Sequence, residues 1–161
     1  MNNHDDGQQA KGSRRQALIA GLLMVALAGP GMAQSRPVAK VWKDPNCGCC
    51  KDWVTHLEGA GFDVQVLDTG NAAARARLGI PQKYGSCHTA QIGGYAIEGH
   101  VPAADIQRLL REAPRAIGLA APGMPVGSPG MDGPAYGGRK DAYDVLLIGT
   151  DGNSTVYQAH R

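Results

Sequence analysis

The sequence contains no block of like charge and no basic stripe interleaved with aromatic residues. A nucleic-acid-binding surface needs such a stripe to neutralise phosphates. Three of the 16 Lys and Arg residues and two of the 14 Asp and Glu residues precede Gln34, so the chain from Gln34 onward has 13 basic and 12 acidic residues and a formal charge of +1. This balance predicts that nucleic acid is not a partner.

The common motifs of hydrolytic and nucleotide-dependent enzymes are also missing. The chain has no Gly-rich phosphate loop, no Ser-His-Asp order and no paired carboxylates at a helical acid-base spacing. Hydrolysis therefore has no support, and the sequence leaves open whether the protein is an enzyme at all.

Long apolar runs are scarce, since the only one covers the 13 residues 17–29. A membrane-spanning helix needs about 20 residues, so the sequence predicts no membrane span in the mature protein. The run follows Ser-Arg-Arg at 13–15 and precedes Gly-Met-Ala at 31–33, which is the order of a signal peptide. We therefore expect 1–33 to be a signal peptide of twin-arginine or Sec type, and 34–161 to be one soluble periplasmic domain.

Cysteine is confined to two short stretches, with Cys47, Cys49 and Cys50 in the first and Cys87, followed directly by His88, in the second. A framework of structural disulfides normally spaces its cysteines along the whole chain. Exposed thiols in the cell envelope oxidise unless a metal or a partner protects them. Thiols crowded this closely suit a thiophilic metal.

Three other interpretations of the cysteines remain open. Two structural disulfides have three possible pairings, of which a bond between the adjacent Cys49 and Cys50 is strained. A structural zinc site would leave Cys49 unused. Cys47 and Cys50 also form the C-x-x-C spacing of a redox dithiol, although a third cysteine between them offers competing disulfides.

Cuprous copper fits the donors better, because it is soft, accepts two or three thiolates and lets one sulfur bridge two ions. Four sulfurs predict one or more copper ions, and His88 adds a nitrogen that also tolerates the cupric state. The alternative for His88 is a hydrogen-bonded residue that orients Cys87. Met124 and Met131, each in a Pro-Gly-Met repeat, are soft donors that could cap the site or pack as apolar filler.

Hydrophobic periodicity and Gly/Pro signals predict the order strand, helix, strand, helix, hairpin, helix. This order matches an α/β, thioredoxin-like fold with a mixed central sheet and flanking helices. In such folds the loop after the first strand lies beside the loop that enters the third, so we expect Cys87 and His88 to face 47–50. The predicted elements are strands at 38–42 and 63–68, helices up to 59 and at 72–78, a hairpin of 89–92 and 95–98, and a helix at 102–112.

Beyond Pro114 the composition changes to Gly, Pro and Ala, and we predict a loop over 113–140 followed by a hairpin of 144–148 and 155–158. The aromatic residues Trp42, Trp53 and Phe62 are expected in the core. No soft donor stands next to the three other histidines of the mature chain in sequence, so surface or hydrogen-bonding roles are expected for His56, His100 and His160.

Five stretches taken together resemble the CopG-like copper-resistance proteins, a family long catalogued as a domain of unknown function. They are 43–50, 85–89, 98–102 and the two Pro-Gly-Met repeats at 122–124 and 129–131, so the resemblance covers roughly 38 to 131. It implies a thioredoxin-like periplasmic protein with a cysteine-bridged copper cluster, ligated by Cys47, Cys49, Cys50 and Cys87, with His88 as a further ligand. Thioredoxins carry a cis-proline where Ser86 and Cys87 stand here, which argues against general disulfide exchange.

The sequence thus predicts a periplasmic copper-binding protein that sequesters copper or changes its oxidation state. The alternatives are a thiol-disulfide oxidoreductase of the envelope and a metallochaperone that passes copper to other envelope copper-handling proteins. Reversible binding by soft ligands serves sequestration and delivery equally, so sequence does not separate them.

Overall fold

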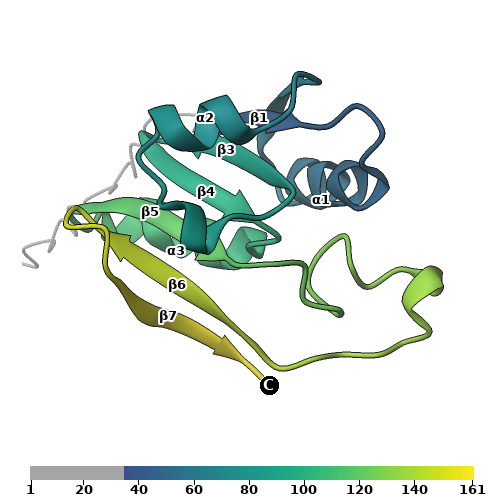
Figure 1. The fold of residues 1–161 in the computed structure, drawn as a ribbon. Helices are drawn as coiled ribbons and strands as arrows, with labels where there is room; N and C mark the ends of the chain where they lie inside the picture. Colours follow the sequence, from purple (N-terminus) through teal and green to yellow (C-terminus); the bar gives the residue numbers. More distant parts are fainter. Residues whose placement is uncertain (1–34) are drawn as a thin grey trace, which may run out of the picture. The chain divides into compact units, whose positions relative to one another are not determined.

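The computed structural model describes residues 35–161. The expected signal peptide, residues 1–33, lies outside these described residues. Figure 1 shows how the elements are arranged. In chain order they are β1 (Val38–Lys43), α1 (Gly48–Gly59), β2 (Asp63–Leu67), α2 (Ala72–Arg77), the 3-10 turn η1 (Gln82–Tyr84), β3 (His88–Ile92), β4 (Tyr95–Gly99), α3 (Ala103–Glu112), β5 (Ala116–Ala121), the 3-10 turn η2 (Pro134–Tyr136), β6 (Tyr143–Gly149) and β7 (Ser154–His160).

One seven-stranded sheet organises this part of the chain, in the order β2-β1-β3-β4-β5-β6-β7. β1 pairs parallel with β2 and antiparallel with β3, while β4 pairs parallel with β5. The remaining neighbours are antiparallel. The expected α/β architecture, a mixed central sheet with flanking helices, is confirmed.

Two hydrophobic clusters lie on opposite faces of β4 and β5. α1 and α3 share the larger cluster, to which Ile97 of β4 contributes. The neighbouring Ala96 joins the smaller cluster with Ile80 and Tyr84, because successive strand residues point to opposite faces. The aromatic residues expected in the core are all buried: Trp42, Trp53 and Phe62.

The hairpin of β3 and β4 forms where the glycine pair predicts it. Gly93 and Gly94 have φ values of 56° and 88°, which residues with a side chain rarely adopt, and they join Ile92 directly to its partner Tyr95. The last hairpin is also confirmed, since β6 and β7 pair antiparallel around the Asp151-Gly152 turn.

The prediction of a loop over 113–140 is wrong for residues 116–121, which form β5 between β4 and β6. The sequence Ala-Ile-Gly-Leu-Ala-Ala has few strong strand formers, so local propensity gives little signal. Any side chain at Gly118 would collide with the backbone of Ala96, so a glycine here lets β5 approach β4 closely. Tertiary packing thus outweighs local preference.

Residues 122–142 connect β5 to β6 and fold back on the molecule. Ser128 and Met131 are buried, and the loop is closed by hydrogen bonds from Gly127 N–H to the carbonyl of Met131 and from Asp141 N–H to the carbonyl of Val126. The sequence left open whether this loop has a defined conformation, and these contacts give it one.

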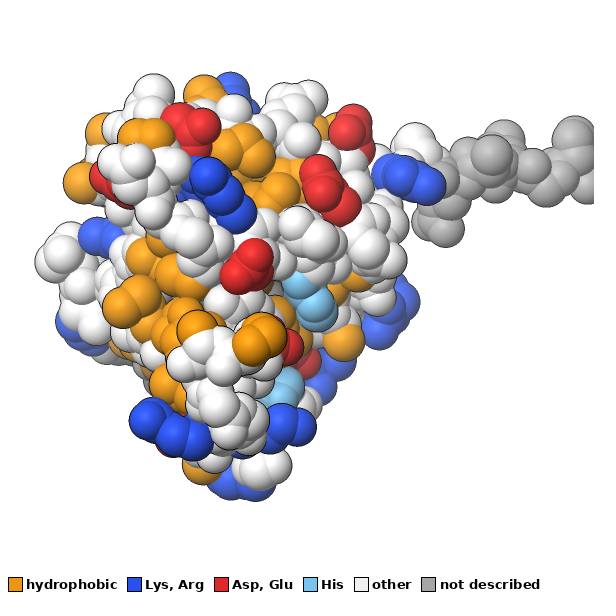
Figure 2. Space-filling model, turned by 90° about the vertical axis from the view of Figure 1, so that its right-hand side faces the viewer, with side chains coloured by type: hydrophobic (Ala, Val, Ile, Leu, Met, Phe, Trp, Pro, Cys, Tyr) orange, Lys and Arg blue, Asp and Glu red, His pale blue; other side chains and the backbone are white. Residues whose placement is uncertain are grey.

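None of the helices within 35–161 combines the length and the apolar character needed to cross a bilayer. On the face drawn in Figure 2, Asp and Glu side chains lie mainly over the upper and middle parts, and several Lys and Arg side chains lie along the lower part.

Candidate metal centre

Cys47, Cys49 and Cys50 lie at the start of α1. The chain leaves β1 through a turn in which Asn46 N–H donates to Asp44 Oδ1 at 2.8 Å and Cys47 N–H donates to the Asp44 carbonyl at 3.1 Å. This turn puts Cys47 at the N-cap position and the other two cysteines in the first helical turn.

Cys87 reaches the same place because of strand pairing. β3 runs antiparallel beside β1, and the register pairs His88 with Lys43, the last residue of β1. Cys87, one residue before β3, therefore lies beside the turn that carries the three other cysteines. The predicted convergence of the two segments is confirmed.

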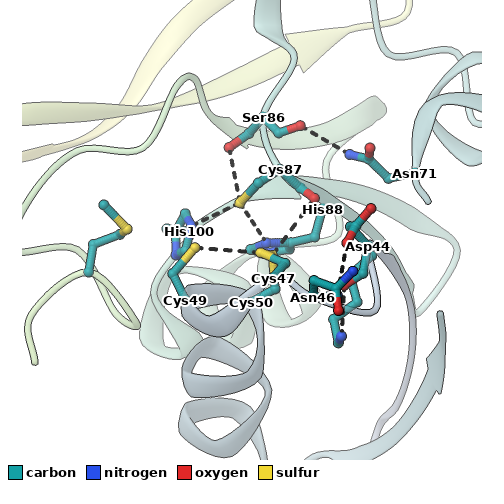
Figure 3. Close-up of a disulfide and its surroundings, with 12 residues drawn as sticks. Asp44, Asn46, Cys47, Cys49, Cys50, Asn71, Ser86, Cys87, His88 and His100 are labelled. Atoms are coloured by element: carbon teal, nitrogen blue, oxygen red, sulfur yellow. Dashed lines mark hydrogen bonds between the residues drawn. A yellow bond between two sulfur atoms is a disulfide. The ribbon is translucent and has the colours of Figure 1, made fainter. Parts of the chain in front are cut away.

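The four sulfur atoms lie within 4.8 Å of one another. Figure 3 shows the side chains of Cys47, Cys49, Cys50 and Cys87 gathered in one place. A disulfide joins Cys47 and Cys50, whereas Cys49 and Cys87 are free. Cys49 Sγ is 3.5 Å from Cys47 Sγ, and Cys50 Sγ is 3.8 Å from the carbonyl oxygen of Cys87. Reduction of this one disulfide would give four thiols in a single place.

His100 belongs to this centre, although its sequence neighbours give no sign of it. Its Nε2 lies 3.1 Å from Cys87 Sγ. Its Nδ1 is 2.9 Å from the carbonyl oxygen of Pro129, a contact in which only the nitrogen can donate, so Nε2 carries the lone pair. The sequence does contain a signal for His100, in the two-glycine turn of the hairpin. This turn pairs Thr89 with Glu98, and extending the same antiparallel register by two residues places residue 100 opposite residue 87.

His88 is completely buried against the centre, with Nδ1 3.4 Å from Cys87 Sγ. Its ring lies 4.3 Å from the Trp53 ring and 4.9 Å from the His100 ring, measured between centroids. Among the described residues, His88 Nε2 has no hydrogen-bond partner. Cys87, His88 and His100 offer ligand atoms within 4.8 Å of one another.

Burial changes the ionisation of these groups. It lowers the pKa of His88 to about 3, with a further contribution from His100. Burial also lowers the pKa of His100, although the hydrogen bond to the Pro129 carbonyl acts in the opposite direction. Burial and then the nearby Cys49 raise the pKa of Cys87 to about 12. Both imidazoles are thus neutral and keep lone pairs for a metal, whereas Cys87 must release a proton when it binds one.

A buried ion pair fixes the segment that carries Cys87. The completely buried Glu98 accepts hydrogen bonds from Arg75 Nε at 2.8 Å and from Ser86 N–H at 2.6 Å. Its other oxygen accepts a hydrogen bond from Thr89 Oγ1 at 2.5 Å. Arg75 also donates to the carbonyl of Ser86 at 2.5 Å, so both polar groups of the Ser86 backbone are held.

The second Pro-Gly-Met repeat lies against the start of α1. A Cβ on Gly130 would lie 2.5 Å from the carbonyl oxygen of Cys49 and 2.8 Å from the nitrogen of Trp53. Gly130 also has a φ of 83°, so both the lack of space and the backbone conformation favour glycine at this position. The carbonyl of the preceding Pro129 holds His100, which makes this turn one wall of the centre.

The two methionines differ in their surroundings. Met131 is buried, and its Sδ accepts a hydrogen bond from the Tyr136 hydroxyl at 3.2 Å, which agrees with the alternative of a packing residue. Met124 is 54% exposed and lines a cavity together with Cys87.

His56 and His160 lie outside the centre, and the hydrogen-bonding roles expected for them are confirmed. His56 Nε2 accepts the N–H of Ala103 at the start of α3, at 3.0 Å. His160 Nε2 is 2.8 Å from Asp105 Oδ2.

The candidate donors therefore form two groups that share Cys87: the four cysteine sulfurs, two of them joined in a disulfide, and Cys87 with one nitrogen each of His88 and His100. A tetrahedral structural zinc site takes four ligands and would leave two donors over. Soft sulfur ligands suit Cu(I) as well as zinc, and imidazole suits both metals. The donor set is compatible with copper.

Two solved structures that are similar to this chain carry names related to copper. Residues 84–131 match a family described as protein of unknown function, DUF411. The chain is similar to two solved structures of the copper resistance protein CopG. Form 2 is 47% identical with a TM-score of 0.72, and the match covers 78% of this chain and 99% of that chain. Form 1 is 48% identical with a TM-score of 0.70, and the match covers 76% of this chain and 96% of that chain. No curated protein sequence matches.

Proposed function

The chain belongs to the CopG family of copper resistance proteins, and on that premise we propose that it binds copper at the cysteine and histidine centre and so contributes to copper resistance. The proposed ligands are the four cysteines and His88, to which the geometry adds His100. We leave Met131 out of this set because Tyr136 occupies its sulfur.

One observation carries the proposal above the others. Sulfur atoms from two segments 37 residues apart in sequence lie within 4.8 Å of one another, beside two buried neutral imidazoles. Structural disulfides would not require the histidines, yet His88 Nδ1 and His100 Nε2 lie 3.4 Å and 3.1 Å from Cys87 Sγ. A soft cation would satisfy both kinds of donor at once.

We further propose that the protein works in the periplasm after export and that its first four strands adopt a thioredoxin-like arrangement. The strand order β2-β1-β3-β4, with β3 antiparallel, supports the second proposal. The spacing of charged, apolar and small residues in 1–33 supports the first.

The disulfide supports a redox role beside sequestration. Oxidation of the Cys47 and Cys50 thiolates to this disulfide releases two electrons, enough to reduce two Cu(II) ions to Cu(I). The same disulfide suits the rival function, a thiol-disulfide oxidoreductase. Reduction of an insulin disulfide by metal-free reduced protein, lost in Cys47→Ser, would favour that rival. A copper chaperone differs from both by transfer of the metal to a second protein.

Copper titration of the reduced protein tests the main proposal. Cys87→Ser removes the sulfur that lies nearest both histidines, so we expect a lower copper stoichiometry or an affinity at least about tenfold weaker. The measurement is competition with a coloured Cu(I) chelator, followed by elemental analysis.

His56→Gln is the matched control, because His56 lies outside the centre and its hydrogen bond can be kept by glutamine. It should bind copper like the wild type. Equal stoichiometry and affinity for wild type and Cys87→Ser would contradict the proposed ligand set.

A further inference from the structure

A cavity of about 360 Å³ opens beside Cys87. Its walls include Ser86 and Cys87 from the segment before β3, and Gly123 and Met124 from the first Pro-Gly-Met repeat. Cys50, His88 and His100 are completely buried and do not line it. The cavity therefore gives solvent access to the centre at the Cys87 side.

The turn that carries Met124 is tied to the Cys87 segment. Gly123 N–H donates to the carbonyl of Gly85 at 3.4 Å, and the Ser86 hydroxyl donates to the carbonyl of Gly123. These contacts hold residues 123 and 124 at the rim of the cavity. The fold thus holds Met124 at the rim of the cavity that Cys87 also lines.

Met124 is one of the few large apolar side chains that remain exposed, at 54%, whereas Met131 in the second repeat is 6% exposed. The same tripeptide therefore places one thioether in the interior and the other in solvent. A thioether is a soft, neutral donor that binds Cu(I) without losing a proton and releases it readily.

We propose that Met124 and Cys87 form a two-sulfur capture site through which Cu(I) enters the centre. This inference rests on the proposed copper function and adds the route that the ion takes. Met124 Sδ binds the incoming ion first. As Cys87 Sγ binds the ion, its thiol proton leaves to solvent, and the bond to Met124 breaks when the buried sulfurs take over. Copper does not change its oxidation state in these steps.

The rate of copper uptake tests the capture site separately from the affinity of the centre. The probe is Cu(I) held by a coloured chelator, mixed in a stopped-flow instrument with the reduced full chain. Met124→Leu keeps the apolar volume and removes the sulfur. We expect uptake at least about threefold slower, with an unchanged stoichiometry and an unchanged final distribution of copper.

Met131→Leu is the matched control, since it makes the same substitution in the second repeat. It should leave the uptake rate unchanged. An unchanged rate in Met124→Leu, or equal slowing in both variants, would overturn the capture site while the final copper content still supports the proposed function. Failure of the wild type to take up copper at all would instead overturn the proposed function and this inference with it.

A second measurement detects the capture site directly. In Cys49→Ser protein with the Cys47–Cys50 disulfide intact, Cys87 is the free thiol that remains in the centre. With ¹³C-methyl-methionine labelling, substoichiometric Cu(I) should shift the Met124 methyl resonance and leave that of Met131 in place. A spectrum in which the Met124 signal does not move would refute the site.

Discussion

Gly130 shows how a single residue determines the distance between the 122–142 loop and the cysteines. Its positive φ and the closeness of Cys49 and Trp53 each exclude a side chain. The carbonyl of Pro129, one residue earlier, fixes the ring of His100. Displacement of Gly130 would therefore disturb two proposed ligands together.

Gly130→Ala should destabilise the protein well beyond the cost of its backbone conformation. Gly123→Ala is the matched control, because Gly123 has a similar φ of 73° and no atom lies within 4 Å of its added Cβ. We expect Gly123→Ala to lower the free energy of unfolding by about 1–2 kcal/mol and Gly130→Ala by about 1–3 kcal/mol more. Urea denaturation measures both. Equal losses would show that the loop does not press on α1.

At the scale of elements, the metal centre depends on how α2, β4 and the segment before β3 are joined. Arg75 of α2 and Glu98 of β4 form a buried ion pair, and each of the two side chains also makes a hydrogen bond with the backbone of Ser86. Both charged groups are buried, so each depends on the opposite charge of its partner for stabilisation. The pair positions Cys87 although it does not touch the sulfur.

Arg75→Leu should cost about 3–5 kcal/mol of folding free energy, because it leaves the Glu98 carboxylate buried without its partner. Arg139→Leu is the control, since the Arg139–Asp141 pair is 4.0 Å long with side chains 70% and 55% exposed. That variant should lose less than about 1 kcal/mol. Chemical denaturation gives both values, and a loss in Arg75→Leu no larger than in the control would contradict the role of the buried pair.

At the scale of the whole molecule, the proposed ligands come from three places: the start of α1, the start of β3 and the end of β4. Copper bound to all three would connect parts of the sheet and α1 that separate on unfolding. Binding to the folded state alone stabilises it by mass action.

Reduced protein should therefore unfold at a higher temperature with Cu(I) than without it. The gain is about 2.7 kcal/mol when free Cu(I) is about 100 times the dissociation constant. Protein with the Cys47–Cys50 disulfide intact offers two free thiols and should gain less. Thermal unfolding followed by circular dichroism measures the difference. Equal stabilisation of the oxidised and reduced forms would exclude Cys47 and Cys50 as ligands.

Most elements could be predicted from the sequence, because their signals are local. Alternating apolar residues predict β1 and β2, and Gly93-Gly94 predicts the β3–β4 hairpin. β5 was not predicted because alanine and glycine have a low propensity for strands. Its place in the sheet depends on the close approach of Gly118 to β4.

The sequence by itself determined the chemistry of this protein: which donors it has, how closely they are spaced within each segment, and that soft ligands favour copper. Only the tertiary structure decided which donors meet. His100 joins the centre through the register of a hairpin, and Met131 turns inward while Met124 stays at the surface. The reason is physical: donor type belongs to each residue, whereas distances between segments are set by strand pairing and by backbone packing at glycines such as Gly130.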